Sequence, residues 1–325
     1  MIELTRKSSL LKQAWELFET SIAKGELLQE SLTEEAFTEK VFLNQEKLSC
    51  IGLASPGGEG FAFGCTDFAQ KKNFITLVMV KEEERKKGIG TALLNALEER
   101  LLKEQETGGE VWNSKCEISF FNPCTFSWKI PGKQANHPNM PGVDMASGTS
   151  TFFEKAGYHV FAVQNSYYLS LKDYESSEII AKKKQELETE GIIFDSYNNK
   201  KQVGMKEMLT SFQNPLWERE ILSEPGKEEG GRNILVPVKE GRVCGFTGPL
   251  DVEQSGRGYF AGIAVDESVR GKGVAKVLFC ELCTGLKNEG ASFMTLFTGE
   301  QNPARKIYEA AGFQIVKSWA DMRKE

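Results

Sequence analysis

The sequence is poor in histidine and has no long apolar run. Its 325 residues include only 2 histidines, His137 and His159, which disfavours hydrolytic mechanisms of the Ser–His and Cys–His kind. The longest apolar stretch, Phe74–Val80, is far shorter than the roughly 20 residues of a membrane helix. Residues 1–20 lack the uninterrupted apolar core of a signal peptide. We therefore expect a soluble protein without a membrane partner.

The cysteines and the charge balance exclude further classes. The 7 cysteines are scattered and odd in number, which is typical of reduced thiols in the cytoplasm. Only Cys280 and Cys283 are closely spaced. Without a second pair we interpret them as small buried residues one helical turn apart, and we expect no metal site. A net charge of −6 argues against a nucleic-acid partner, which needs clustered Lys and Arg.

What the chain does contain is a repeat. The length suggests two domains of about 150 residues each, and the pairs Val80 and Val265, Arg85 and Arg270, and Gly88 and Gly273 are all 185 positions apart. Each copy has an apolar strand, Phe74–Val80 or Tyr259–Val265, which we expect to be buried on both faces. An acidic turn, a glycine loop that begins with arginine and a helix with a leucine-rich face follow. We interpret this constant offset as a duplicated unit.

The similarity extends to both sides of the glycine loop. Upstream, Ile51–Pro56 matches Cys244–Pro249 in its Gly and Pro, and each follows a polar turn, so we expect a hairpin strand. Downstream, Phe152–Tyr158 matches Ile307–Phe313 with an offset of 155, so the first copy holds 30 additional residues. They fall in the Pro-, Asn- and Gly-rich stretch of about 108–147, which we predict to be a long loop.

These boundaries divide the chain into a first unit of residues 1–173, a linking helix over 174–190 and a second unit of residues 191–325. Short apolar segments at residues 1–4 and 191–195 begin the two units as strands. Because each unit alternates strands and helices, we predict an α/β fold with a mixed sheet in two tandem domains.

The glycine loop predicts a phosphate-binding turn. Glycine lets the backbone approach a ligand closely, and the start of the next helix offers unpaired N–H groups and a positive dipole end. Arg85, Lys86, Lys87, Arg270 and Lys272 add positive charge. The loop is neither a Walker loop nor a complete dinucleotide fingerprint.

The second copy continues with Asn302, Ala304, Tyr308, Gly312 and Phe313. With this segment and the two glycine loops, the chain resembles the GNAT superfamily of acetyl-CoA-dependent N-acetyltransferases, in two copies that cover nearly the whole length. The resemblance implies that the loop binds the coenzyme pyrophosphate through backbone amides and that the preceding strand pairs with the pantetheine arm. It also implies that Asn302 lies near the coenzyme and that Tyr308 protonates the departing thiolate.

The resemblance thus predicts two sets of coenzyme-binding residues. In the second unit they are Ile263, Ala264, Val265, Arg270, Gly271, Lys272, Gly273, Val274, Ala275, Lys276, Asn302 and Arg305. In the first unit they are Val78, Met79, Val80, Arg85, Lys86, Lys87, Gly88, Ile89, Gly90 and Thr91.

The first unit departs from the family pattern. Phe153 stands at the Tyr position, Ser147 at the Asn position and Thr149 at the Ala position. Because Phe153 has no hydroxyl to donate, we expect the second unit to carry the chemistry. Tyr158 or Tyr167 is the alternative acid for the first unit. His137 and Asp144 in the long loop are candidate substrate contacts.

The expected reaction is direct transfer of an acetyl group from acetyl-CoA to a primary amine of a small molecule. Backbone amides near Ile263–Val265 would stabilise the oxyanion. A general base is not identified; Asp251, Glu253 and Glu300 are candidates at strand ends. Two other interpretations remain open: a non-catalytic acyl-CoA-binding or regulatory protein, and a protein or peptide N-acetyltransferase.

Overall fold

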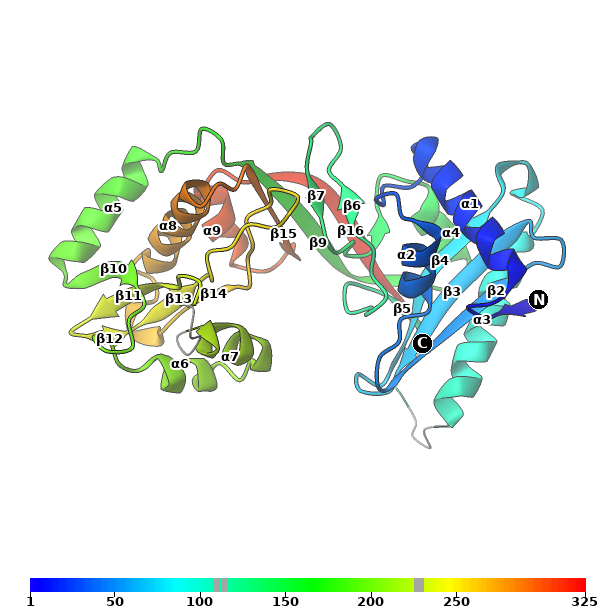
Figure 1. Ribbon diagram of the computed structural model, residues 1–325, viewed down its shortest axis with the longest axis horizontal. Coiled ribbons are helices and arrows are strands. Elements are labelled where there is room, and N and C mark those ends of the chain that lie inside the picture. Colours follow the sequence, from blue (N-terminus) through cyan, green and yellow to red (C-terminus); the bar gives the residue numbers. More distant parts are fainter. Residues whose placement is uncertain (108–111, 113–115, 225–230) are drawn as a thin grey trace. The chain divides into compact units, whose positions relative to one another are not determined.

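The chain folds into two compact units (Figure 1). The computed structural model describes residues 1–107, 112, 116–224 and 231–325. Unit 1 consists of Met1–Asn165 and Lys317–Glu325, and unit 2 of Ser166–Val316. The described residues include no helix that is long and apolar enough to cross a membrane.

Unit 1 is built on a twisted sheet covered by helices on both faces. Four strands run antiparallel to their neighbours, and β4 then pairs with β5 in parallel at Phe74 and Glu117. Its main strands are β1 (Ile2–Leu4), β2 (Leu48–Ala54), β3 (Gly60–Asp67), β4 (Lys72–Val80) and β5 (Cys116–Ile118). Its helices are α1 (Ser9–Ala23), α2 (Glu34–Val41), α3 (Ile89–Glu106) and α4 (Thr149–Lys155).

Alternation along the strands of unit 1 creates two cores. Phe61 and Phe63 of β3 pack with α1 and α2, whereas Ala62 between them packs with α3. Leu93, Leu94, Leu97 and Leu101 of α3 are fully buried, as their helical spacing predicts. We expected β4 to be buried on both faces, but Thr76, Val78 and Val80 are only half-buried. This face of β4 borders the cavities described below.

Unit 2 repeats this plan with shorter strands. The antiparallel order is β10 (Ile192–Ser196), β11 (Leu235–Lys239), β13 (Gly245–Thr247) and β14 (Ile263–Val265), with β12 (Arg242–Val243) beside β11. Strand β15 (Phe293–Gly299) neighbours β9 (His159–Ser170). The helices are α5 (Glu178–Thr189), α6 (Met205–Ser211), α7 (Pro215–Leu222), α8 (Val274–Asn288) and α9 (Arg305–Ala310). Cys280 and Cys283 are buried on α8, as predicted.

The helix expected over 174–190 forms, but it starts at Glu178, where the Ser177 hydroxyl caps it. It lies in unit 2 and packs against α8, with Lys184 ion-paired to Glu281 at 2.9 Å. It is therefore part of a packed unit and not a separate linker.

The end of the chain also departs from the sequence-based boundaries. Strand β16 (Gln314–Lys324) begins in unit 2, but from Lys317 onward it belongs to unit 1, where Met322 pairs with Ile118 of β5. The boundary between the units likewise falls inside β9. Boundaries drawn along the sequence assign each strand to one unit, so they miss β9 and β16, which contribute residues to both.

The stretch of about 108–147 is not simply a loop. Besides β5, it contains the short strands β6 (Trp128–Lys129), β7 (Asn136–His137) and β8 (Val143–Asp144). Trp128 is fully buried against Trp319, with ring centroids 4.8 Å apart. Residues 108–111 and 113–115 lie outside the described residues. The prediction was wrong because two-residue strands leave no periodic pattern, although one side chain of each is buried.

The upstream repeat was also matched wrongly. Ile51–Pro56 lies mostly in β2, whereas Cys244–Pro249 contains β13, the counterpart of β3. Gly60 faces Val80, as Gly245 faces Val265, so the offset of 185 continues through these glycines. At either glycine a Cβ atom would lie within 3 Å of a carbonyl oxygen of the facing strand. Only the strand of the second copy follows a hairpin turn; β2 follows helix α2.

Candidate active site

The two glycine loops adopt the same backbone conformation. In unit 2, Gly271 and Gly273 have φ values of 77° and 92°, and in unit 1 Lys86 and Gly88 have 62° and 86°. Among the described residues, the backbone N–H groups from Gly271 to Ala275 and from Lys86 to Thr91 have no backbone partner. Successive free N–H groups at a helix start form an anion-binding concavity. Both loops therefore have the backbone that phosphate binding requires.

The loop arginines also occupy equivalent positions. Arg85 Nε donates to the Val80 carbonyl oxygen at 3.0 Å. Arg270 Nε donates to that of Val265 at 3.3 Å. Each guanidinium is thus held at the end of the strand that precedes its loop.

In unit 2 a cavity of about 830 Å³ lies beside the loop. It is bordered by β14, the start of α8, the start of α9, and two aromatic side chains, Phe212 and Trp217. Arg270, Lys276 and Lys306 line it, and the described lining includes no carboxylate. The cavity therefore combines an apolar channel with positive charge, as a phosphorylated ligand with an apolar arm requires.

Ten of the twelve predicted coenzyme residues of unit 2 border this cavity. They are Ile263, Ala264, Val265, Arg270, Gly271, Gly273, Val274, Ala275, Lys276 and Asn302. Lys272 instead pairs with Glu190 at 3.2 Å. Arg305 donates to Glu309 at 3.1 Å and to the Glu300 carbonyl oxygen at 3.0 Å, so its hydrogen bonds hold it on α9 and on the turn before it.

Tyr308 lies on α9 and is not among the described lining residues of the cavity, although its neighbour Ile307 is. It is only 7% exposed and packs among Phe279, Phe260 and other rings, with the Phe279 centroid 5.0 Å away. In the described part of the chain its hydroxyl has no hydrogen-bond partner. Burial raises the pKa of Tyr308 to about 12. The phenol is therefore protonated at neutral pH and free to donate.

Asn302 begins the turn that leads into α9. Its side-chain oxygen accepts a hydrogen bond from the Ala304 N–H at 3.0 Å. This contact fixes the turn that brings Asn302, Pro303 and Ala304 to the cavity.

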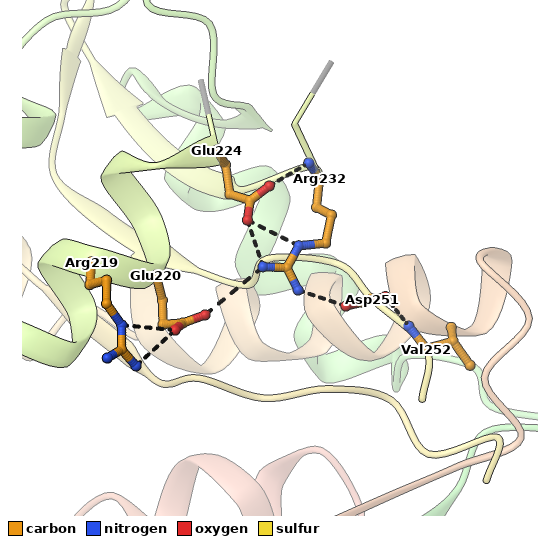
Figure 2. A network of polar contacts seen from close by, with 6 residues as sticks. All are labelled: Arg219, Glu220, Glu224, Arg232, Asp251 and Val252. Atoms are coloured by element: carbon orange, nitrogen blue, oxygen red, sulfur yellow. Dashed lines mark hydrogen bonds and ion pairs between the residues drawn. The ribbon is translucent and has the colours of Figure 1, made fainter. Parts of the chain in front are cut away.

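None of the candidate bases is among the described lining residues. Asp251 pairs with Arg232 at 2.6 Å, and Glu253 pairs with the buried Arg257. The Asp251 pair belongs to a network in which the almost fully buried Glu224 holds Arg232, whose guanidinium also faces Glu220 (Figure 2). Asp251 and Glu253 thus have structural partners, whereas Glu300 is exposed in the turn after β15, so no base is assigned.

Unit 1 has a smaller cavity of about 340 Å³ at the same place. Of its predicted residues, Val78, Met79, Val80, Arg85 and Gly90 line it, and Lys86, Lys87, Gly88, Ile89 and Thr91 do not. Thr149 and Phe152 stand where unit 2 has Ala304 and Ile307. Glu26 and Leu27, from the segment after α1, complete the wall.

A second cavity of about 140 Å³ continues inward between β4 and β5, and Phe153 borders it. Of the further residues suggested for unit 1, only Asp144 reaches this wall, and it pairs with Lys317 at 2.8 Å. Tyr158 is buried elsewhere and donates to Glu98 at 2.9 Å. Tyr167 is not an acid for unit 1 because it belongs to unit 2, where it packs on Tyr308.

His137 is buried, with Nδ1 2.9 Å from the Asn139 carbonyl oxygen. Within the described residues, no group of three or more His, Cys, Asp or Glu side chains is placed to hold a metal ion.

Sequence reasoning missed Trp217, Phe212 and Glu26 because none of them lies in a repeated motif. Trp217 sits in the first turn of α7, capped by Asn214 with Pro215 next to it, and its indole N–H donates to Ala261 at 3.0 Å. A Cβ atom on Gly262 would lie 2.4 Å from that indole nitrogen. The contact explains why β14 starts only at Ile263 and not at Tyr259, as the apolar pattern suggested.

Comparisons with known proteins agree with this arrangement. The family model of the acetyltransferase (GNAT) family matches residues 10–115 and 202–313. A GCN5-related glucosamine N-acetyltransferase region of a fungal multi-domain GH3 β-N-acetylglucosaminidase superposes with a TM-score of 0.67 at 16% identity. That alignment covers 99% of this chain but only 37% of the fungal chain. No curated protein sequence matches significantly.

Two further solved structures have similar lengths. A GCN5-related N-acetyltransferase from Sphaerobacter thermophilus has a TM-score of 0.56 at 16% identity, covering 96% of this chain and 91% of its own. A tandem GNAT protein from the clavulanic acid biosynthesis pathway has a TM-score of 0.55 at 14% identity, covering 100% and 97%. At such identities these structures show the shared fold. The family match and the duplicated loop together establish that this chain belongs to the GNAT acetyltransferase family and contains two GNAT units in tandem.

Proposed function

We propose that the protein is an acetyl-CoA-dependent N-acetyltransferase that acts on a primary amine of a small molecule, with its reaction in unit 2. The observation that carries the proposal is the unit 2 cavity. It joins free loop N–H groups, three basic side chains and apolar lining residues, and Tyr308 lies on α9, whose neighbouring residue Ile307 lines it. The GNAT fold supports acyl transfer in general.

Coenzyme binding follows from the loop. The N–H groups of Gly271 to Ala275 and the side chains of Arg270 and Lys276 would hold the pyrophosphate. The open edge of β14 and the apolar side chains of Val269, Ala304 and Ile307 would receive the pantetheine arm. When bound, acetyl-CoA supplies the activated acetyl group.

Tyr308 is the proposed acid. Burial keeps its proton in place, and the same apolar surroundings raise the proton affinity of a thiolate that leaves beside it. Proton donation to the sulfur then offsets the cost of a buried anion. Phe153, at the same place in unit 1, has no proton to donate.

The test is acetyl transfer from acetyl-CoA to a panel of small amines, followed by thiol release. Glucosamine belongs in the panel because the structure with a TM-score of 0.67 is a glucosamine N-acetyltransferase region. We expect turnover with at least one amine and a loss of roughly 100-fold or more in kcat for Tyr308→Phe.

Phe153→Leu is the matched control and should leave kcat unchanged. Equal losses from the two variants would overturn the assignment to unit 2. Coenzyme binding without transfer to any acceptor would favour a binding protein, and transfer to peptides alone would point to a protein acetyltransferase.

A further inference from the structure

The two loop arginines have different carboxylate partners. Arg270 Nη1 meets Glu267 Oε1 at 3.0 Å. The Glu267 side chain is 86% exposed, lies three residues away on the same turn, and is not among the lining residues of the cavity. This is a weak surface pair, so Arg270 remains available to a ligand.

Arg85 is held much more firmly. Its Nη1 and Nη2 donate to Glu26 Oε1 and Oε2 at 3.1 and 2.6 Å, a bidentate pair. The Glu26 side chain is 27% exposed and lines the two unit 1 cavities described above, next to β4. Bidentate Arg–carboxylate contacts are among the stronger hydrogen bonds in proteins. The guanidinium of unit 1 is therefore already occupied.

The position of Glu26 is fixed by its own segment. Gly25, with φ 73°, ends α1, and the Glu26 N–H returns to the Ser21 carbonyl oxygen at 2.9 Å. Lys24 in the same turn pairs with Glu82, just before the loop, at 2.7 Å. Two ion pairs, to Glu82 and to Arg85, thus hold this turn beside the segment that leads into the glycine loop.

The carboxylate of Glu26 is ionised. Its hydrogen bonds with Arg85 hold its pKa below the usual value. A negative charge at the cavity wall repels a phosphorylated ligand. It also neutralises the arginine that would attract one. The unit 2 cavity has no described carboxylate in its lining. It is more than twice as large as the cavity of about 340 Å³ beside the unit 1 loop.

We propose that Glu26 excludes the coenzyme from unit 1, so that the chain binds one coenzyme molecule although it contains two glycine loops of the same conformation. The inference builds on the proposed function, which places the coenzyme in unit 2. It assigns to one side chain the difference in ligand occupancy between the units.

The experiment is titration calorimetry of the full chain with coenzyme A, which binds without turnover. Native protein should bind one equivalent. Glu26→Gln, which removes the charge at nearly constant shape, should bind two, and so should Glu26→Ala, which also frees Arg85. Glu267→Gln is the matched control in unit 2 and should stay at one. Circular dichroism confirms that each variant is folded.

Each result decides a separate point. Two equivalents in native protein, or one equivalent in both folded Glu26 variants, would overturn the inference and leave the proposed function intact. No binding by native protein together with one equivalent in Glu26→Gln would support the role of Glu26 and overturn the assignment to unit 2.

Discussion

The two units share one backbone motif and differ in what surrounds it. At both loops the positions 185 residues apart have the same left-handed conformations, and both arginines donate to the end of the preceding strand. In unit 2 the neighbouring wall is basic and apolar, whereas in unit 1 it contains Glu26. The comparison teaches that a duplicated loop keeps its local conformation, while residues distant in the chain set the charge of the wall around it.

The largest expected effect comes from comparing an ion pair whose carboxylate is buried with one whose carboxylate is more accessible. Glu224 is 1% exposed and holds Arg232, which also pairs with Asp251. Glu224→Gln weakens the charge-assisted hydrogen bonds to Arg232 and should destabilise unit 2 by up to about 3 kcal/mol. Glu26→Gln, at a more accessible pair, should cost less than about 1 kcal/mol. Denaturant unfolding measures both. A similar loss from the two would mean that Glu26 holds unit 1 together, against its proposed role.

Next is a pH effect confined to unit 1. Burial raises the pKa of Asp321 to about 6, although Gln164 donates to it at 2.8 Å. Because the folded state binds this proton more tightly, stability should fall as the pH rises from about 4 to about 6, by on the order of 2–3 kcal/mol. In Asp321→Asn the melting temperature, measured by thermal unfolding at several pH values, should depend less on pH over that window. An unchanged slope in Asp321→Asn would assign the effect to another group.

The loop arginines provide the direct functional contrast. Arg270→Gln should weaken coenzyme A binding by roughly 10- to 100-fold, because hydrogen bonds to charged groups contribute about 1.5–3 kcal/mol. Arg85→Gln should leave the affinity unchanged, since Glu26 already occupies Arg85. Calorimetry measures both. Loss of affinity in Arg85→Gln alone would reverse the roles of the units.

The smallest effects concern two glycines of the unit 1 loop. Gly88 has φ 86°, so Gly88→Ala should cost about 1–2 kcal/mol in strain although its Cβ would meet open space. Gly90→Ala should be neutral or stabilise by about 0.4–1 kcal/mol. The new Cβ would lie 3.5 Å from Phe152, and unit 2 carries Ala275 at the same place. Thermal unfolding of both variants checks this order.

Sequence reasoning succeeded where the pattern is local. The glycine loop, the apolar strand before it and the leucine face after it occur in one continuous segment, and strand β4 with helix α3 formed as predicted. The same holds for α8 and its buried Cys280 and Cys283. These elements follow from periodicity and from positive φ angles, which neighbouring residues determine.

It failed where the structure depends on distant partners. The crossing of β16 into unit 1 at Lys317 and the burial of Trp128 against Trp319 involve segments far apart in the chain. Trp217 and Glu26 reach the cavities from outside any motif. The match of Ile51–Pro56 to the wrong strand shows that Gly and Pro identities mislead unless the pairing of Gly60 with Val80 is known.

The central claim, that only unit 2 binds the coenzyme, is tested most directly at the free N–H groups themselves. Hydrogen–deuterium exchange of the native chain with and without coenzyme A reports on both loops in one experiment. We predict that the ligand slows exchange in peptides covering Gly271 to Ala275 and leaves those covering Lys86 to Thr91 unchanged. Protection of both loops, or of the unit 1 loop alone, would contradict the account.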